Sequence, residues 1–185
     1  MKKIAIVYFS ASGTTQQMAS AVASGIEEQG AHPISLRIEG KHLIEGRFVE
    51  KAIFQQLACC DAIVFGAPTY MGGPAAQFKA FADASSDSWS QQLWRNKPAA
   101  GFTVGGSVSG GQEATLQYFM MLASQHGMLW TGIDLPNGYN DKTINRWGEQ
   151  LGAIGWTENG ELEKRDWLTG QYLGQRIASI TAGIP

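Results

Sequence analysis

Four hydroxyl side chains gather around one glycine in the segment 8–17, which reads YFSASGTTQQ. They are Ser10, Ser12, Thr14 and Thr15, and the glycine is Gly13. The segment 10–15, called the hydroxyl loop below, follows an apolar run and precedes a helical pattern. A helix start offers unpaired backbone N–H groups and partial positive charge, which bind phosphate readily. No lysine or arginine lies in the loop, so we expect dipoles and neutral donors to hold the anion. A helix cap with incidental hydroxyls is the alternative.

The two commoner nucleotide-binding loops do not fit this segment. The P-loop needs a lysine directly after its second glycine, and none follows Gly13. The dinucleotide fingerprint needs three glycines, and the hydroxyl loop has one. The flavodoxin pattern [ST]-x-[ST]-G-x-[ST] is complete, with Ser10, Ser12, Gly13 and Thr15 at its fixed positions. This match predicts that the loop binds the phosphate of flavin mononucleotide (FMN).

Two glycine-rich loops follow later apolar runs. The first contains Pro68, Thr69, Tyr70, Met71 and Gly72, and the second contains Gly105, Gly106, Ser107 and Gly110. Ligands of open α/β sheets bind beyond the carboxyl ends of the strands, so these loops should meet the hydroxyl loop. Backbone groups of the first loop can bond a flat ring near its N5 edge, and the second can reach its pyrimidine end. Together the loops favour FMN, although Tyr70 alone could be an ordinary loop aromatic.

Short, continuous apolar runs alternate with helical patterns along the chain. Strands are expected at 4–9, 32–38, 62–66, 99–104 and 128–130, and helices at 15–29, 49–58, 75–84, 113–125 and 165–180. Continuous apolar strands are typical of parallel sheets that are covered on both faces. The alternation therefore predicts one doubly wound α/β domain over residues 1–185.

The segment 132–160 breaks this alternation. It contains six glycines and the run DLPNGYNDK, and it is too long for a routine connection. We expect an irregular insertion that covers the active site or contacts another subunit. An inert surface excursion is the alternative.

Composition excludes several classes of protein. The 185 residues are 44% hydrophobic and 16% charged, with a formal net charge of −2, which indicates neither nucleic-acid binding nor attachment to a membrane surface. No apolar stretch is long enough to span a bilayer. The adjacent Cys59 and Cys60 read as small buried residues, and no zinc-ligand spacing exists, so no metal is expected. A reducing, cytoplasmic location follows as the expectation.

The chain resembles the flavodoxin-like superfamily and, within it, the type IV NAD(P)H:quinone oxidoreductases, also called the Trp-repressor-binding-protein family. The motifs that carry this resemblance are GAPTYMGGPAAQFKAFAD, GGQEATL and QHGM, and it covers about residues 3–131. It implies a flavodoxin-like, doubly wound, five-stranded parallel sheet in the order 2-1-3-4-5, with helices on both faces. It also implies FMN-dependent, two-electron, ping-pong transfer of hydride from NAD(P)H through flavin N5 to a quinone.

The resemblance also implies roles for individual residues. Ser10–Thr15 would hold the FMN phosphate, Thr69–Met71 would flank the ring, and Gly105–Gly110 would wrap its pyrimidine side. Trp89 aligns with an active-site tryptophan that a neighbouring subunit supplies. His126 aligns with an active-site histidine near the flavin, where it could bond or protonate the quinone oxygen.

Several alternatives stay open. The family commonly has an arginine where this chain has Tyr70, so the choice between NADH and NADPH is not fixed. His126 could instead be a capping or core histidine, and Trp89 could be a buried anchor. The assembly is expected to be a homo-oligomer, either a tetramer or a dimer. The alternative function is that of a flavodoxin-type electron carrier without turnover of its own.

Overall fold

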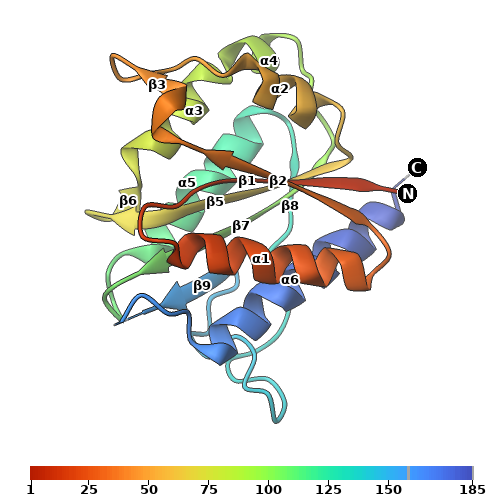
Figure 1. Cartoon of the computed structure of the whole chain (residues 1–185). Helices are drawn as coiled ribbons and strands as arrows, with labels where there is room; N and C mark the ends of the chain where they lie inside the picture. Colours follow the sequence, from red (N-terminus) through yellow and green to blue (C-terminus); the bar gives the residue numbers. More distant parts are fainter. Residues whose placement is uncertain (158, 185) are drawn as a thin grey trace.

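A parallel β-sheet forms the centre of the computed structural model, which describes residues 1–157 and 159–184 (Figure 1). Its main path runs β2-β1-β5-β7-β8, which confirms the expected five-strand order 2-1-3-4-5. These strands are β1 (Lys3–Phe9), β2 (His32–Ile38), β5 (Ala62–Tyr70), β7 (Pro98–Gly105) and β8 (Leu129–Trp130). β7 is buried along its whole length, whereas β2 at the edge is only partly buried, as their apolar and mixed sequences predict.

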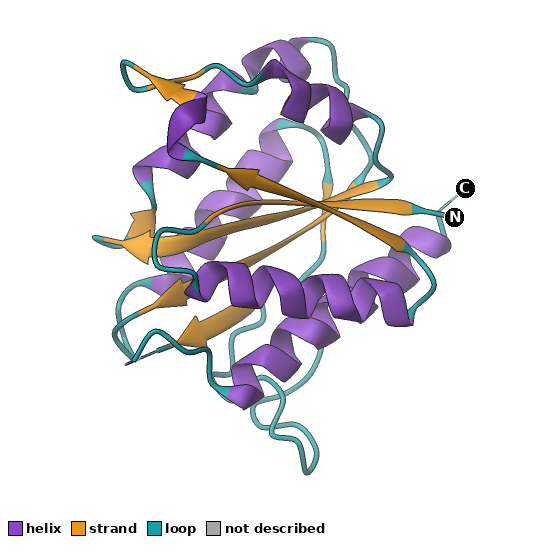
Figure 2. Cartoon of the chain, viewed as in Figure 1, coloured by secondary structure: helices purple, strands orange, loops and turns teal. Residues whose placement is uncertain are grey.

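Helices cover both faces of the sheet (Figure 2). One face carries α1 (Thr14–Glu28) and α6 (Lys164–Ala182), which pack on the core around Ile4, Val64 and Phe102. The other face carries α2 (Lys51–Ala58), α3 (Ala76–Ala84), α4 (Ser86–Ser90) and α5 (Gln112–Gln125). The five expected helices are confirmed to within two residues at each end. The short α4, the 3-10 turn η1 (Gly40–His42) and the hairpin of β3 (Leu43–Ile44) with β4 (Arg47–Phe48) are additional.

The fifth strand of the sheet is interrupted. β8 pairs with Pro98–Ala99 at the start of β7, and β9 (Ala153–Trp156) pairs in parallel with Phe102–Gly105 along the same strand. The intervening residues 131–152 leave the sheet and return beside their starting point, because the Ile133 N–H donates to the Gln150 carbonyl at 2.8 Å. The segment 132–160, expected to be irregular throughout, therefore contains a strand. Four residues without strand-like alternation gave no local signal for it.

The carboxyl ends of β1, β5 and β7 lie next to one another, because the three strands pair in parallel. The loops that follow them gather at the left of the view in Figure 1. They are the hydroxyl loop, the hairpin loop (Tyr70–Gly73) between β5 and β6 (Gly73–Pro74), and the glycine loop (Gly105–Gly111) before α5. The fold thus positions the three predicted loops as one edge of the molecule.

Candidate functional site

The hydroxyl loop is held in shape by the first of its own hydroxyls. Ser10 Oγ accepts hydrogen bonds from the N–H groups of Gly13 and Gln16, each at 3.2 Å. Gly13 has φ of +98°, a left-handed conformation that glycine adopts without steric cost. Ser10 and Gly13 therefore build the turn that leads the chain into α1.

The loop leaves donors free at the start of α1. Thr14 and Thr15 are each 3% exposed, and their backbone N–H groups have no partner within 1–157 and 159–184. The Thr15 hydroxyl is likewise unpaired in these ranges, while Thr14 Oγ1 donates to the Gly160 carbonyl at 3.3 Å and lies 3.4 Å from Ser12 Oγ. Amides at a helix start with adjacent hydroxyls form a site for an anion.

One cation lies beside this loop. Arg37, on β2, donates to the Ser10 carbonyl and to Gln16 Oε1, each at 2.9 Å. The expectation that dipoles and neutral donors alone surround the anion site is therefore corrected. Arg37 lies outside the loop in sequence, and only the pairing of β2 with β1 brings it there.

The hairpin loop places two predicted ring contacts at the surface. Tyr70 is half exposed, and Met71 is fully exposed at the tip of the turn. Met71 and Gly72 have φ of +49° and +76°, the positive pair typical of a type I′ hairpin turn. A Cβ on Gly111 would lie 3.1 Å from Gly72 Cα, so the hairpin loop and the glycine loop touch.

The hydroxyl of Thr69 is used inside the protein. Thr103 Oγ1 donates to the Ala67 carbonyl at 2.7 Å, and Thr69 Oγ1 lies 2.8 Å from the hydroxyls of both Thr103 and Thr115. Each hydroxyl has one proton, so Thr115 must donate to Thr69, and Thr69 to Thr103. Thr69 thus supports the hairpin loop from below, and only its backbone is left to flank a ring. Pro68 is buried in β5, and its carbonyl accepts from Ala75 N–H.

The glycine loop wraps around a side chain that is absent from the residues predicted for the site. Gln112 is 4% exposed; its Nε2 donates to the Ser107 carbonyl, and its Oε1 accepts from Gly110 N–H at 2.8 Å. The Gly106 carbonyl accepts from the indole Nε1 of Trp156 at 3.3 Å. The motif GGQEATL holds a signal for Gln112, because a glutamine directly after glycines can fold back on their backbone. Nothing local points to Trp156.

His126 is separated from these loops. It ends α5, and a helix of 14 residues places it about 20 Å from the glycine loop that begins the same helix. The ring is 2% exposed, stacks on Trp94 at 4.0 Å between centroids, and bonds Ser85 Oγ through Nε2 at 2.9 Å. Burial lowers the pKa of His126 to about 4, so the imidazole is neutral at pH 7. These contacts favour the core-histidine alternative over an acid in the chain's own site.

This burial predicts a loss of stability in acid. The folded pKa of about 4 is below the ordinary 6.5, so protonation favours the unfolded chain as pH falls through that window. At pH 5 we expect the free energy of unfolding to be about 2 kcal/mol lower than at pH 7.5 on account of His126. Urea denaturation of wild type and His126→Gln at both pH values measures this difference. A variant that loses as much stability as wild type between them would contradict it; the exposed His32→Gln is the matched control.

Trp89 also lies away from the loops. It belongs to α4, which follows the far end of α3 and lies at the top of Figure 1. Its side chain is 47% exposed, so it is not a buried anchor. A contact between Trp89 and a flavin would therefore have to be made in the site of a neighbouring subunit.

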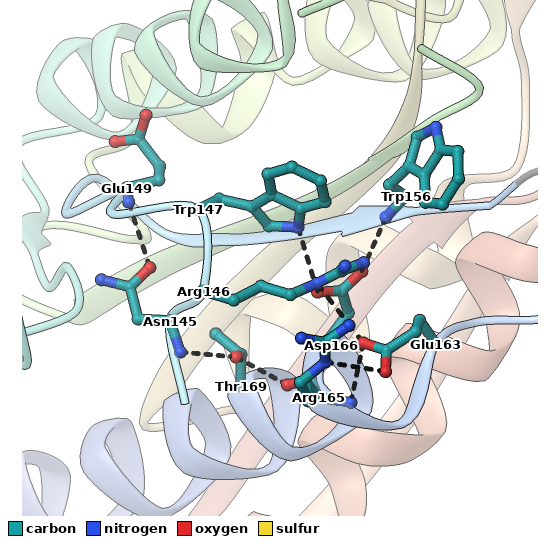
Figure 3. Close-up of polar contacts among 9 residues, drawn as sticks. All are labelled: Asn145, Arg146, Trp147, Glu149, Trp156, Glu163, Arg165, Asp166 and Thr169. Atoms are coloured by element: carbon teal, nitrogen blue, oxygen red, sulfur yellow. Dashed lines mark hydrogen bonds and ion pairs between the residues drawn. The ribbon is translucent and has the colours of Figure 1, made fainter. Parts of the chain in front are cut away.

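A buried carboxylate joins the interrupting segment to α6 and β9 (Figure 3). Asp166 is fully buried and accepts from Arg146 Nε and Nη2 at 2.6 and 2.7 Å, from Trp147 Nε1 at 3.0 Å and from Trp156 N–H at 2.9 Å. The bonds to Asp166 raise the pKa of Arg146, whose guanidinium also lies 4.2 Å from the centre of the Trp147 ring. The segment 131–152 is thereby fixed beside the strand that supports the glycine loop.

Two kinds of feature are missing from the described ranges. No helix within 1–157 and 159–184 has both the length and the apolar character to cross a membrane. The same residues contain no group of histidine, cysteine or acidic side chains arranged to hold a metal ion.

A family model described as NADPH-dependent FMN reductase matches residues 2–134. The chain belongs to this family. A solved relative, described as a flavodoxin, WrbA-like protein from Agrobacterium tumefaciens, is 36% identical, covers 99% of both chains and superimposes with a TM-score of 0.75. The flavodoxin-like resemblance seen in the motifs is therefore confirmed.

Curated proteins that are similar to this chain include a quinone dehydrogenase and a flavodoxin. An NAD(P)H dehydrogenase (quinone) from Deinococcus radiodurans is 31% identical over 195 residues, covering 97% of this chain and 96% of its own. Flavodoxin FldP from Pseudomonas aeruginosa is 35% identical over 158 residues, covering 83% and 80%.

Proposed function

We propose that this chain is an FMN-dependent NAD(P)H:quinone oxidoreductase. The observation that carries the proposal is the convergence of three loops at the carboxyl edge of the sheet, where the N–H groups of Thr14 and Thr15 are unpaired within the described ranges. Family membership supports it, as does similarity to quinone dehydrogenases along nearly the whole chain.

The phosphate end of FMN fits the hydroxyl loop. Within the described ranges the N–H groups of Thr14 and Thr15 and the Thr15 hydroxyl are unpaired, and with Ser12 beside them they match the oxygens of a phosphate. Arg37 lies close enough to the loop backbone to offset part of the negative charge. The site therefore suits a dianion without a lysine in the loop.

The ring end of FMN fits the two later loops. Gly72 and Gly111 meet without side chains between them, which lets backbone approach a flat ligand. FMN, when bound, supplies two-electron exchange between a nicotinamide nucleotide and a quinone. The chain binds and orients the ring, and the exposed Tyr70 and Met71 border the face that a substrate would approach.

Purified protein provides the direct test. We expect a yellow protein with flavin absorption bands, which oxidises NADPH or NADH rapidly when benzoquinone is present. A colourless protein that does not take up added FMN would refute the proposal.

Substitution of Thr15 tests the phosphate site. Thr15→Ala removes a hydroxyl that would bond the charged phosphate. The loss should cost about 1.5–3 kcal/mol of binding free energy, which raises the dissociation constant of FMN roughly ten- to a hundredfold. Titration of apoprotein, followed by quenching of flavin fluorescence, measures it. Riboflavin, which lacks the phosphate, should bind wild type and variant equally, and an unchanged FMN constant would count against the site.

We further propose that the enzyme is a cytoplasmic homo-oligomer. The partly exposed Leu93 and Val49 line a mostly apolar hollow of about 780 Å³ between α2 and α4, and the exposed Trp89 follows Ser88, another of its lining residues, on α4. Arg47 and Lys51 lie on one side of this hollow and Asp87 on the other, so a two-fold copy could pair opposite charges. Cys60 is buried as expected, whereas Cys59 is exposed, which corrects the expectation that both are buried; free thiols at the two positions suit a reducing compartment.

If Trp89 completes a neighbour's site, protein held monomeric by Trp89→Glu should bind FMN but lose quinone turnover. Sedimentation velocity establishes the monomer, and full turnover by it would exclude this role.

A flavodoxin-type electron carrier is the second candidate, favoured by the similarity to Flavodoxin FldP. Carriers usually dock through a strongly acidic face, and a net charge of −2 offers little of one. Bound flavin without NAD(P)H oxidation in the benzoquinone assay would select the carrier.

A further inference from the structure

We propose that Gln112 and Trp156 are positioning residues that aim the N–H groups of the glycine loop at the flavin ring and so help to set its reduction potential. This inference rests on the proposed binding of FMN. Among the described residues, no hydrogen bond joins Gln112 or Trp156 to the hydroxyl loop, so their effect should be confined to the ring end.

Gln112 fills the inside of the glycine loop. Its two amide atoms bond the backbone at both ends of the turn, Nε2 to the Ser107 carbonyl and Oε1 to Gly110 N–H. A Cβ on Gly105 would lie 2.4 Å from Gln112 Nε2, so a side chain there would displace the amide. Gly105 and Gln112 are thus matched to each other.

Trp156 holds the loop from the side of β9. Its indole bonds the Gly106 carbonyl, and its own N–H is bound to Asp166 in the buried network of Figure 3. Asp166 is fixed in turn by both guanidinium contacts from Arg146. Residues 146, 156 and 166 all lie beyond the segment that the family model matches. The contacts that orient the glycine loop from the side of β9 therefore come from the later part of the chain.

These contacts set the direction of two peptide groups. In a trans peptide the C=O and the following N–H point in opposite directions. With the carbonyls of Gly106 and Ser107 turned toward Trp156 and Gln112, the N–H groups of Ser107 and Val108 point away from them. Neither N–H has a partner in the described ranges.

Fixed donors of this kind bind the electron-rich form of a ligand more tightly than the electron-poor form. The ring of reduced FMN carries more electron density at its pyrimidine end than the oxidised ring. The glycine loop should therefore raise the reduction potential, and loosening it should lower the potential.

Gln112→Met tests this with little change in side-chain volume. We expect the dissociation constants of FMN and riboflavin to rise together by about tenfold, from the loss of two hydrogen bonds. The dissociation constant of reduced FMN should rise roughly tenfold more than that of oxidised FMN, which lowers the two-electron midpoint potential by about 30 mV. Gln117→Met is the control, because Gln117 lies on the same helix and its side chain bonds the exposed Glu113.

The outcomes separate the two proposals. If wild type binds no flavin, the proposed function fails. If wild type binds FMN and Gln112→Met has unchanged constants and potential, or loses affinity for FMN but not for riboflavin, the positioning role is wrong. Should Gln112→Met fail to fold, Trp156→Phe decides, since it keeps the backbone N–H to Asp166 and removes only the indole donor. For Trp156→Phe we expect the affinity for FMN and for riboflavin to fall about threefold and the reduction potential to fall. Unchanged affinities and an unchanged potential would refute the positioning role.

Discussion

Asp166→Ala should destabilise the protein by about 3–5 kcal/mol, because it removes the acceptor at the centre of a buried polar network. The substitution leaves the guanidinium of Arg146, 13% exposed, without its bidentate partner. It also leaves Trp147 Nε1 and Trp156 N–H without an acceptor. For a chain of this size, the midpoint of thermal unfolding should fall by roughly 6–20 °C. Urea and thermal denaturation of the apoprotein measure both quantities.

Two further variants identify the cause of this loss. Asp134→Ala removes the carboxylate of a surface pair with Arg176, partly exposed on both sides, and should cost less than about 1 kcal/mol. After loss of Asp166, the largely buried guanidinium of Arg146 is left with the partly exposed Glu163 at 3.3 Å, so adding Arg146→Met should restore part of the stability. Equal losses in Asp166→Ala and Asp134→Ala would show that the buried network contributes little.

Gly174→Ala should cost about 3 kcal/mol, because α1 and α6 meet backbone to backbone. A Cβ on Gly174 would stand 2.1 Å from the Val22 carbonyl oxygen, and one on Gly25 would stand 1.9 Å from that of Gln171. Backbone atoms cannot rotate aside as a side chain can, so the helices must separate and lose packing on the core. This outweighs the roughly 1 kcal/mol that alanine gains over glycine within a helix. Urea denaturation of the apoprotein measures the change.

The matched control is Gly183→Ala, just past the end of α6. A Cβ there would lie 3.5 Å from the Ile180 carbonyl, an ordinary contact, so stability should change by less than about 0.5 kcal/mol. If Gly174→Ala were equally neutral, the close approach of the two helices would not be needed for stability.

The sheet and its loops could be predicted because their signals are local. Ile4–Phe9 and Ala62–Gly66 are continuous apolar runs, which only a strand buried on both faces requires. The hydroxyl loop and the glycine loop carry residue types that a turn and a helix start demand. These elements follow from neighbours in the sequence, and their order follows from the resemblance.

The residues that were missed depend on distant partners. The local sequence around Asp166 on α6 gives no sign that this carboxylate is buried. Its burial depends on Arg146, which the segment 131–152 brings into contact with it. Arg37 reaches the hydroxyl loop only through strand pairing. His126 is a different case: its predicted role comes from a family motif, and the length of α5 places it about 20 Å from the glycine loop of its own chain. A motif match gives a residue's position in the sequence, whereas its distance from the site in space depends on the length of the helix that separates them.

The interruption of the fifth strand bears on which parts of the chain are dispensable. Between the β7 residues that pair with β8 and with β9 lie only Ala100 and Gly101, a gap of about 10 Å that two linking residues could cross. By geometry alone, the excursion over 131–152 could be excised and the sheet edge closed. Arg146 prevents this, because its deletion would leave the buried carboxylate of Asp166 without its ion-pair partner. The segment is therefore not dispensable by itself, and a shortened chain would have to replace Asp166 at the same time.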